Sequence, residues 1–132
     1  MRSPSFLFMA LAVLALCEAA VLEKVHTSVT NRLGSGKSII LHCQSKDTDL
    51  GEHTVADGGE FGWEFSVNVI GTTLFYCDVS WENFGGFHFD AYSFQRDWGR
   101  CESRCLWLIS KEGMYGWNQN TGFWEFMYSW PN

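Results

Sequence analysis

The sequence predicts an all-β fold, a small antiparallel β-sandwich of about seven to eight strands held by disulfides. Apolar and polar residues alternate with a period of two in several short runs, which is typical of half-buried strands. Glycine-containing turns separate these runs, and an even number of cysteines follows the first 19 residues. No later run has convincing helical periodicity, so we expect a single β domain.

Each expected strand is defined by residues that share one face. Aromatic residues make up 17% of the chain, and such large rings bury enough surface for a small domain to form a core. The residues that share a face, strand by strand, are Val25, Thr27 and Val29; Ile39, Leu41 and Cys43; Phe61, Trp63, Phe65 and Val67; Phe75, Cys77, Val79 and Trp81; Phe87, Phe89 and Ala91; Cys105, Trp107 and Ile109; and Trp124, Phe126, Tyr128 and Trp130.

The N-terminus has the pattern of a secretory signal peptide. Arg2 precedes an apolar run over residues 6–16, and small residues follow it. The run is shorter than the roughly 20 apolar residues that a membrane span needs. We therefore expect cleavage after Ala19, which leaves residues 20–132 as one secreted, extracellular domain.

The net charge of −6 argues against nucleic acid and anionic membranes as partners. We therefore expect no nucleic-acid binding and no membrane insertion. For the mature chain we expect a monomer.

Four cysteines in the mature chain predict two disulfides. Cys43, Cys77 and Cys105 lie on the apolar faces of their strands, whereas Cys101 lies in a polar segment. Spacing alone leaves all three connectivities open. We favour Cys43 with Cys105 and Cys77 with Cys101, because a Cys101–Cys105 bridge would close a loop too short to stabilise the fold much.

The stretch HCQSKDTDLG, residues 42–51, contains possible metal ligands. His42 and Cys43 are adjacent on an expected strand, so they point to opposite faces and cannot hold one ion. A calcium loop that began at Asp47 would need glycine at its sixth position and glutamate at its twelfth, where the sequence has Glu52 and Gly58. We therefore expect a strand that runs into an acidic turn, and neither a metal nor another cofactor.

The sequence offers no nucleophile motif for a hydrolase. A Gly-x-Ser-x-Gly elbow is missing from it, and the cysteines are expected to be paired. Carboxylates for glycoside hydrolysis would have to be recognised by their spatial separation, which the sequence leaves open. We expect a protein that is not an enzyme and has no catalytic residues.

Two kinds of residue are candidates for binding a partner. The segment QRDWGRCESR, residues 95–104, places both signs of charge around a tryptophan, and Trp and Arg are enriched at binding hot spots; the alternatives are an ordinary solvated loop here or a second binding loop in acidic residues 47–57. Exposed tryptophans could instead stack on sugars, although rings at alternating positions are more often core. The loop candidates are Gln95, Arg96, Asp97, Trp98, Arg100 and Arg104, and the tryptophans are Trp98, Trp117, Trp124 and Trp130.

Several stretches, taken in order, resemble the plant self-incompatibility proteins and their S-protein homologues. They are VTNRL at 29–33, HCQSKDTDLG at 42–51, FGWEF at 61–65, LFYC at 74–77 with Trp81, FD at 89–90 and CESRCLW at 101–107. The resemblance implies a small secreted β protein without catalytic residues. It also implies an extracellular signalling ligand recognised by a plant cell-surface receptor protein, as founding members are in the rejection of self pollen. The alternative is a cell-wall carbohydrate-binding module.

Overall fold

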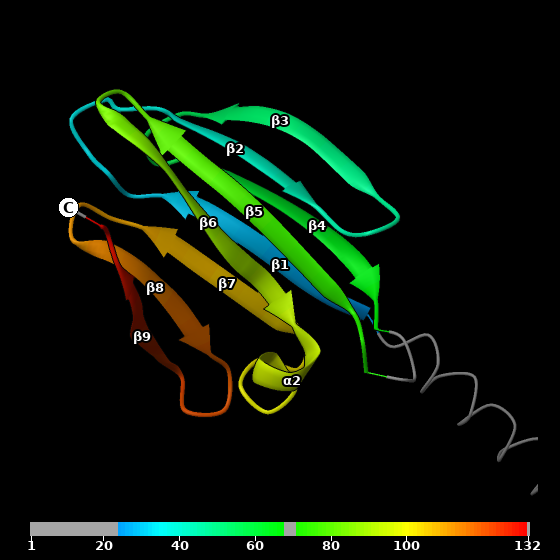
Figure 1. The fold of residues 1–132 in the computed structure, drawn as a ribbon. Coiled ribbons are helices and arrows are strands. Elements are labelled where there is room, and N and C mark those ends of the chain that lie inside the picture. Colours follow the sequence, from blue (N-terminus) through cyan, green and yellow to red (C-terminus); the bar gives the residue numbers. More distant parts are fainter. Residues whose placement is uncertain (1–23, 68–70, 132) are drawn as a thin grey trace, which may run out of the picture.

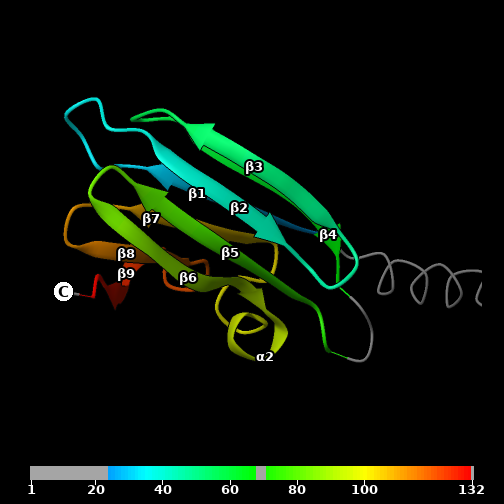
Figure 2. The ribbon, with the colours of Figure 1, turned by 45° about the horizontal axis from the view of Figure 1, so that its top comes forward.

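In the computed structural model, which describes residues 24–67 and 71–131, two β-sheets face each other (Figures 1 and 2). The predicted all-β sandwich is confirmed. The strands are β1 (Lys24–Asn31), β2 (Ile39–Gln44), β3 (Asp49–Val55), β4 (Glu60–Ser66), β5 (Leu74–Trp81), β6 (Phe84–Ser93), β7 (Arg104–Ile109), β8 (Gly113–Asn118) and β9 (Phe123–Ser129), and a single helical turn, α2 (Phe94–Asp97), follows β6.

The five-stranded sheet has the order β4-β1-β7-β8-β9, and the four-stranded sheet has the order β3-β2-β5-β6. Neighbouring strands are antiparallel except β1 and β7, which are parallel. The expected signal peptide lies outside the described residues. Within residues 24–67 and 71–131, no helix has the length and apolar character to cross a membrane.

Two strands were missing from the sequence prediction. Strand β3 lies in the segment that the sequence suggested as an acidic loop, residues 47–57. Its residues DLGEHTV form an edge strand with little burial, so they show no apolar alternation. Strand β8 contains two glycines, Gly113 and Gly116, which obscure its pattern. The Gly116 position is close-packed, because an added Cβ there would lie 2.8 Å from an Arg100 nitrogen and 3.1 Å from the Trp107 ring.

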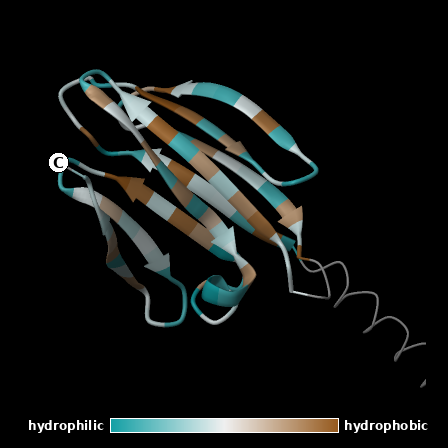
Figure 3. Ribbon diagram, viewed as in Figure 1, coloured by the Kyte–Doolittle hydropathy of each residue, from teal (hydrophilic) through white to brown (hydrophobic). Residues whose placement is uncertain are grey.

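The core lies between the two sheets and follows the predicted alternation in β1, β2, β5 and β7. Their inward residues, such as Val29, Leu41, Val79 and Ile109, are almost completely buried, and bands of apolar and polar residues alternate along the ribbons (Figure 3). Trp107 on β7 is the largest fully buried side chain among the described residues. Its Nε1 donates a hydrogen bond of 2.9 Å to the Ala91 carbonyl of the opposite sheet.

The prediction for the last strand is wrong in one respect. Trp124, Phe126, Tyr128 and Trp130 do not share one face, because a register shift between Met114 and Tyr115 pairs Tyr115 with Phe126 but Met114 with Tyr128. This bulge inserts one extra residue into β9. Trp124 and Phe126 are consequently exposed, whereas Tyr128 and Trp130 pack against the core.

The disulfide pairing predicted from the sequence is also wrong: Cys43 bonds to Cys77, and Cys101 bonds to Cys105. Cys43 on β2 and Cys77 on β5 are directly opposed in the sheet, and both face the core. Cys101 lies in the loop before β7, and Cys105 is the second residue of β7. Loop length governs how much a disulfide stabilises, whereas proximity governs whether it forms, so the argument from loop length chose the wrong partners.

Candidate functional site

The candidate segment 95–104 divides into charges that point inward and residues that stay on the surface. Gln95, Trp98 and Arg104 are exposed. Asp97 is completely buried, and Arg100 is nearly so. The segment is therefore not a free charged loop.

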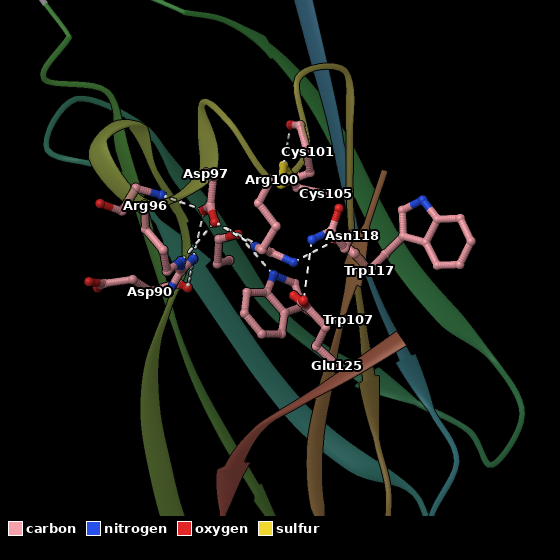
Figure 4. Close-up of polar contacts among 12 residues, drawn as sticks. Asp90, Arg96, Asp97, Arg100, Cys101, Cys105, Trp107, Trp117, Asn118 and Glu125 are labelled. Carbon is pink, nitrogen blue, oxygen red and sulfur yellow. Dashed lines mark hydrogen bonds and ion pairs between the residues drawn. A yellow bond between two sulfur atoms is a disulfide. The ribbon is translucent and has the colours of Figure 1, made fainter. Parts of the chain in front are cut away.

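Asp97 is the centre of a buried network of charges (Figure 4). Its carboxylate accepts hydrogen bonds from Nε and Nη2 of Arg96, both at 2.7 Å. It also accepts bonds from Nε and Nη2 of Arg100 at 3.1 and 2.9 Å, and one from the Ser93 amide at 2.9 Å. A buried carboxylate is costly unless it is paired and hydrogen-bonded, and here all of its partners come from the same stretch of chain.

The two arginines extend this network into both sheets. Arg96 donates from Nη1 to the Tyr128 hydroxyl at 3.0 Å and from Nη2 to the Asp90 carbonyl at 2.8 Å. Arg100 donates from Nη1 to the Trp117 carbonyl at 2.6 Å. Both guanidinium carbons lie 5.1 Å from the centroid of the Trp107 ring, whose π face stabilises the extra positive charge.

The pKa of Arg96 reflects this environment. Burial favours a lower pKa, but the hydrogen bonds and the negative charge of Asp97 outweigh it and raise the pKa above its ordinary value. The raised pKa keeps Arg96 in its charged form. The charges of Arg96, Asp97 and Arg100 join α2 to both sheets.

The outer surface of the β8–β9 hairpin carries a group of aromatic side chains, which we call the aromatic face: Tyr115, Trp117, Trp124 and Phe126. Phe126 is 52% exposed and Trp124 is 40% exposed. Phe123, the cross-strand partner of Asn118, is 70% exposed but lies on the other side of β9. Tyr115 opposes Phe126 with ring centroids 5.3 Å apart, and Trp117 opposes Trp124 at 5.1 Å. These cross-strand pairs form a ladder on the side of the hairpin that faces away from the core.

The aromatic face continues onto the neighbouring strand β7. Leu108 is the cross-strand partner of Tyr115, and both Leu106 and Leu108 are only half-buried. The result is an apolar surface that crosses three adjacent strands, β7, β8 and β9. A contiguous apolar surface of this kind marks an interaction site more often than scattered apolar residues do.

The structure separates the four candidate tryptophans. Trp98, on the loop after α2, is 56% exposed, with its ring stacked on Phe94 at 5.6 Å. Trp117 and Trp124 belong to the aromatic face. Trp130 instead packs edge-on against Trp81 at 5.1 Å and donates a hydrogen bond of 2.8 Å to the Ser110 carbonyl.

Sequence reasoning missed Phe123, Phe126 and Tyr115 as surface residues. Their alternation is the same whether a strand's apolar side faces the core or the solvent. The available signal was that β9 carries apolar residues on both of its faces, because Trp124 and Phe126 face outward while Met127 and Tyr128 pack inward. A strand at the edge of a two-layer sandwich can bury only one of those faces.

One group of possible metal ligands, Asp97 with Cys101 and Cys105, brings its ligand atoms within 4.8 Å of one another in the described part of the chain. Its sulfur atoms are bonded to each other, and its carboxylate is neutralised by two arginines. These groups are therefore already satisfied without an ion.

Comparisons with known proteins agree with this architecture. Residues 26–130 match the family described as plant self-incompatibility protein S1. The chain is 41% identical over 102 residues to Self-incompatibility protein S1 of Papaver rhoeas, a match that covers 76% of this chain and 73% of the relative. It is 37% identical over 112 residues to S-protein homolog 2 of Arabidopsis thaliana, covering 82% and 69% respectively.

A solved structure has the same fold. It is described as that of SPH (Self-Incompatibility Protein Homologue) proteins, a widespread family of small, highly stable, secreted proteins from plants. It superposes with a TM-score of 0.58 at 16% identity, covering 84% of this chain and 93% of the solved one. The matches in sequence extend over most of the two-sheet domain, and the chain therefore belongs to the plant self-incompatibility protein S1 family.

Proposed function

We propose that this secreted protein is an extracellular signalling ligand, and that a plant cell-surface protein binds it at the aromatic face of the β8–β9 hairpin. The observation that carries the proposal is the exposure of Trp124 and Phe126 on this face, at 40% and 52%. Leaving such rings in water forgoes the stabilisation that burial gives, of the order of 2 kcal/mol each. A partner that covers them recovers that free energy on binding.

The hairpin is a rigid support for such an interaction. The Arg100 guanidinium holds the Trp117 carbonyl, and the Asn118 amide donates to the Glu125 carboxylate across the hairpin at 3.2 Å. The Gln119 amide donates to the Arg100 carbonyl at 2.8 Å. A surface that is already ordered loses little conformational entropy when it binds, and aromatic residues are enriched at protein interfaces.

The alternative, a carbohydrate-binding module, predicts coplanar exposed rings that would stack along a glycan. The observed pairs are not coplanar, since Trp117 and Trp124 are tilted by 58° and Tyr115 and Phe126 by 70°. Such an uneven surface favours interdigitation with protein side chains. We therefore prefer a protein partner and a role without catalysis.

The test is a binding assay with labelled, oxidised protein, residues 20–132, on protoplasts and on isolated cell walls. We expect saturable binding to protoplasts that protease treatment of the cells removes. The variant Trp124→Ala/Phe126→Ala should bind at least about tenfold more weakly, because aromatic anchors at interfaces contribute more than about 1.4 kcal/mol each.

A matched control tests whether any loss is specific to this surface. Ile40→Ala/Leu74→Ala removes two apolar residues of comparable exposure, 42% and 40%, from the opposite sheet, and should bind like the wild type. Equal loss in both variants would indicate non-specific adhesion. Retention by cell walls that a soluble glycan competes away would support the carbohydrate-binding alternative instead.

A further inference from the structure

We propose that a hollow at one end of the sandwich binds an acidic sugar, a uronic acid of the kind found in plant cell-wall polysaccharides. The hollow, which we call the lysine hollow, is lined by Leu33, Ser35, Lys37, Trp81 and Lys111. None of these residues belongs to the aromatic face, so this inference does not depend on the proposed function.

Both sheets contribute to the lysine hollow. Leu33, Ser35 and Lys37 lie between β1 and β2, Trp81 ends β5, and Lys111 lies between β7 and β8. Strands β1, β5 and β7 all end on the same side of the molecule (Figure 1). The volume of the hollow, about 380 Å³, is within the range of about 300–1,000 Å³ that is usual for ligand pockets.

Trp81 has one ring face free for a ligand. Its ring stacks on Phe84 with centroids 4.1 Å apart and planes 13° apart, which covers the first face. The Trp130 centroid lies 5.1 Å from that of Trp81 and 5.5 Å from that of Phe84. A ring at nearly equal distances from both members of a stack lies beside the stack, so Trp130 leaves the second face of Trp81 uncovered. Trp81 lines the hollow, whereas Phe84 and Trp130 do not.

The two lysines provide positive charge that has no partner. Lys37 and Lys111 are exposed, and neither takes part in an ion pair within the described part of the chain. A Cβ added to Gly34 would lie 3.9 Å from Cε of Lys111, so the Lys111 side chain lies along the turn that carries Lys37. A carboxylate in the hollow would therefore face two ammonium groups without displacing an existing partner, and such charge-assisted hydrogen bonds are strong.

The acidic residues at this end do not neutralise the lysines. Asp57 accepts hydrogen bonds of 3.1 and 3.0 Å from two amides of the turn between β1 and β2. Glu112 accepts one of 2.8 Å from the Tyr115 hydroxyl, which lowers the pKa of Glu112 more than the charge of Lys111 does. Glu82 is exposed and in no ion pair of the described residues. The net charge of −6 is therefore compatible with a local site for an anion.

The wall of the hollow that carries Lys37 is held in place by a buried side chain. The Asn31 side chain, which is completely buried, donates to the Lys37 carbonyl at 2.8 Å and accepts from the Leu33 amide at 3.0 Å. The Lys37 amide also donates to the Gly34 carbonyl at 3.2 Å. A preformed wall of this kind loses little conformational entropy when a ligand binds.

The combination of one aromatic face and two ammonium groups selects the class of ligand. The π face of an indole ring is negative, so it attracts the weakly positive C–H groups on the face of a sugar ring. The ammonium groups favour a carboxylate. A neutral sugar could use only the first interaction, and a small anion without a ring could use only the second, whereas a uronic acid uses both.

The experiment is a titration of isotope-labelled, oxidised protein, residues 20–132, with a trimer of galacturonic acid, followed by NMR. We expect the indole N–H signal of Trp81 to shift and to saturate. Lys37→Gln/Lys111→Gln should weaken binding at least about tenfold, because hydrogen bonds to charged groups are lost. Lys24→Gln/Lys46→Gln removes the same net charge from two exposed lysines outside the hollow, and this matched control should bind like the wild type.

Two further titrations test the class of ligand. Cellotriose has sugar rings without carboxylates, and citrate has carboxylates without a ring. Both should bind at least about tenfold more weakly than the galacturonic acid trimer, because each retains only one of the two interactions. Equal binding of either compound, no saturable shift, or equal losses in the two lysine variants would overturn the proposal.

The variant that tests the aromatic face separates this inference from the proposed function. Trp124→Ala/Phe126→Ala should bind the galacturonic acid trimer like the wild type, because neither residue lines the lysine hollow. A loss of trimer binding in that variant would place the sugar on the hairpin and overturn the assignment to the lysine hollow.

Discussion

The segment 95–104 and the β8–β9 hairpin are neighbours with opposite compositions and opposite environments. Hydrogen bonds of the Arg100 guanidinium and carbonyl to the backbone of Trp117 and Gln119 join them. Asp97 and Arg100 of the segment are buried and Arg96 is half-buried, whereas the outer aromatic rings of the hairpin lie on its surface. Residue type alone would predict exposed charges and buried aromatic rings. In this molecule, hydrogen-bonding partners and position in the sheet decide whether a side chain is buried.

Different causes act in the two regions. Asp97 can be buried because five hydrogen bonds from Arg96, Arg100 and Ser93 reach its two oxygens. The outer aromatic rings are exposed because the described residues form only two layers, and none of the described elements covers that side of the five-stranded sheet. The buried charges of the segment therefore have partners within the described chain, whereas the outer rings of the hairpin remain exposed to solvent.

The largest effect should follow from neutralising the buried carboxylate. Asp97→Asn keeps the shape but leaves Arg96 and Arg100 without a negative partner, and breaking a buried ion pair costs about 3–5 kcal/mol. We expect urea unfolding to show a loss of that size. Glu102→Gln, an exposed residue of the same segment, should change the free energy of unfolding by less than about 0.5 kcal/mol. A loss below about 1 kcal/mol for Asp97→Asn would show that the arginines are stabilised by Trp107 and the carbonyls alone.

A smaller effect should follow from removing the disulfide at the end of the segment. Cys101 and Cys105 are 4 residues apart, and Cys43 and Cys77 are 34 apart. The loop-entropy relation gives about 2 kcal/mol for the first pair and about 4 kcal/mol for the second. We therefore expect Cys101→Ala/Cys105→Ala to lower the free energy of unfolding by about half as much as Cys43→Ala/Cys77→Ala. Equal losses would mean that Cys101–Cys105 also holds the Asp97 network in place.

The same comparison explains which features the sequence could predict. The all-β class and the inward residues of β1, β2, β5 and β7 follow from alternation, which is a local property. The strand partners of Cys43 and His42 depend on the register between segments far apart in the chain, which cannot be read from the sequence. The register of β2 and β5 pairs Cys43 with Cys77 and His42 with Asp78. The sequence was sufficient to exclude a metal site made of the adjacent residues His42 and Cys43. It could not reveal which residues lie beside them on neighbouring strands.

The candidate site was predicted in part. Of the four tryptophans named as candidates, Trp98 and Trp124 are exposed, whereas Trp117 and Trp130 are half-buried. Arg96, Asp97 and Arg100 were chosen because arginine and tryptophan are frequent in binding sites, but the same residue types form buried guanidinium–tryptophan contacts. Only the number of partners around each charge distinguishes the two situations, and that number is a property of the fold.

The smallest effect should come from the most exposed ring of the hairpin. Phe123→Ala should change the free energy of unfolding by less than about 0.5 kcal/mol, because Phe123 is 70% exposed. Phe89→Ala, at a position that is 3% exposed, should cost about 3–5 kcal/mol, although the deleted atoms are the same. A cost above about 1 kcal/mol for Phe123→Ala would mean that a second molecule covers the ring in solution, and the cost would then fall on dilution, because association stabilises the folded state by mass action. A negligible cost at every protein concentration would show that no second copy of the chain covers Phe123.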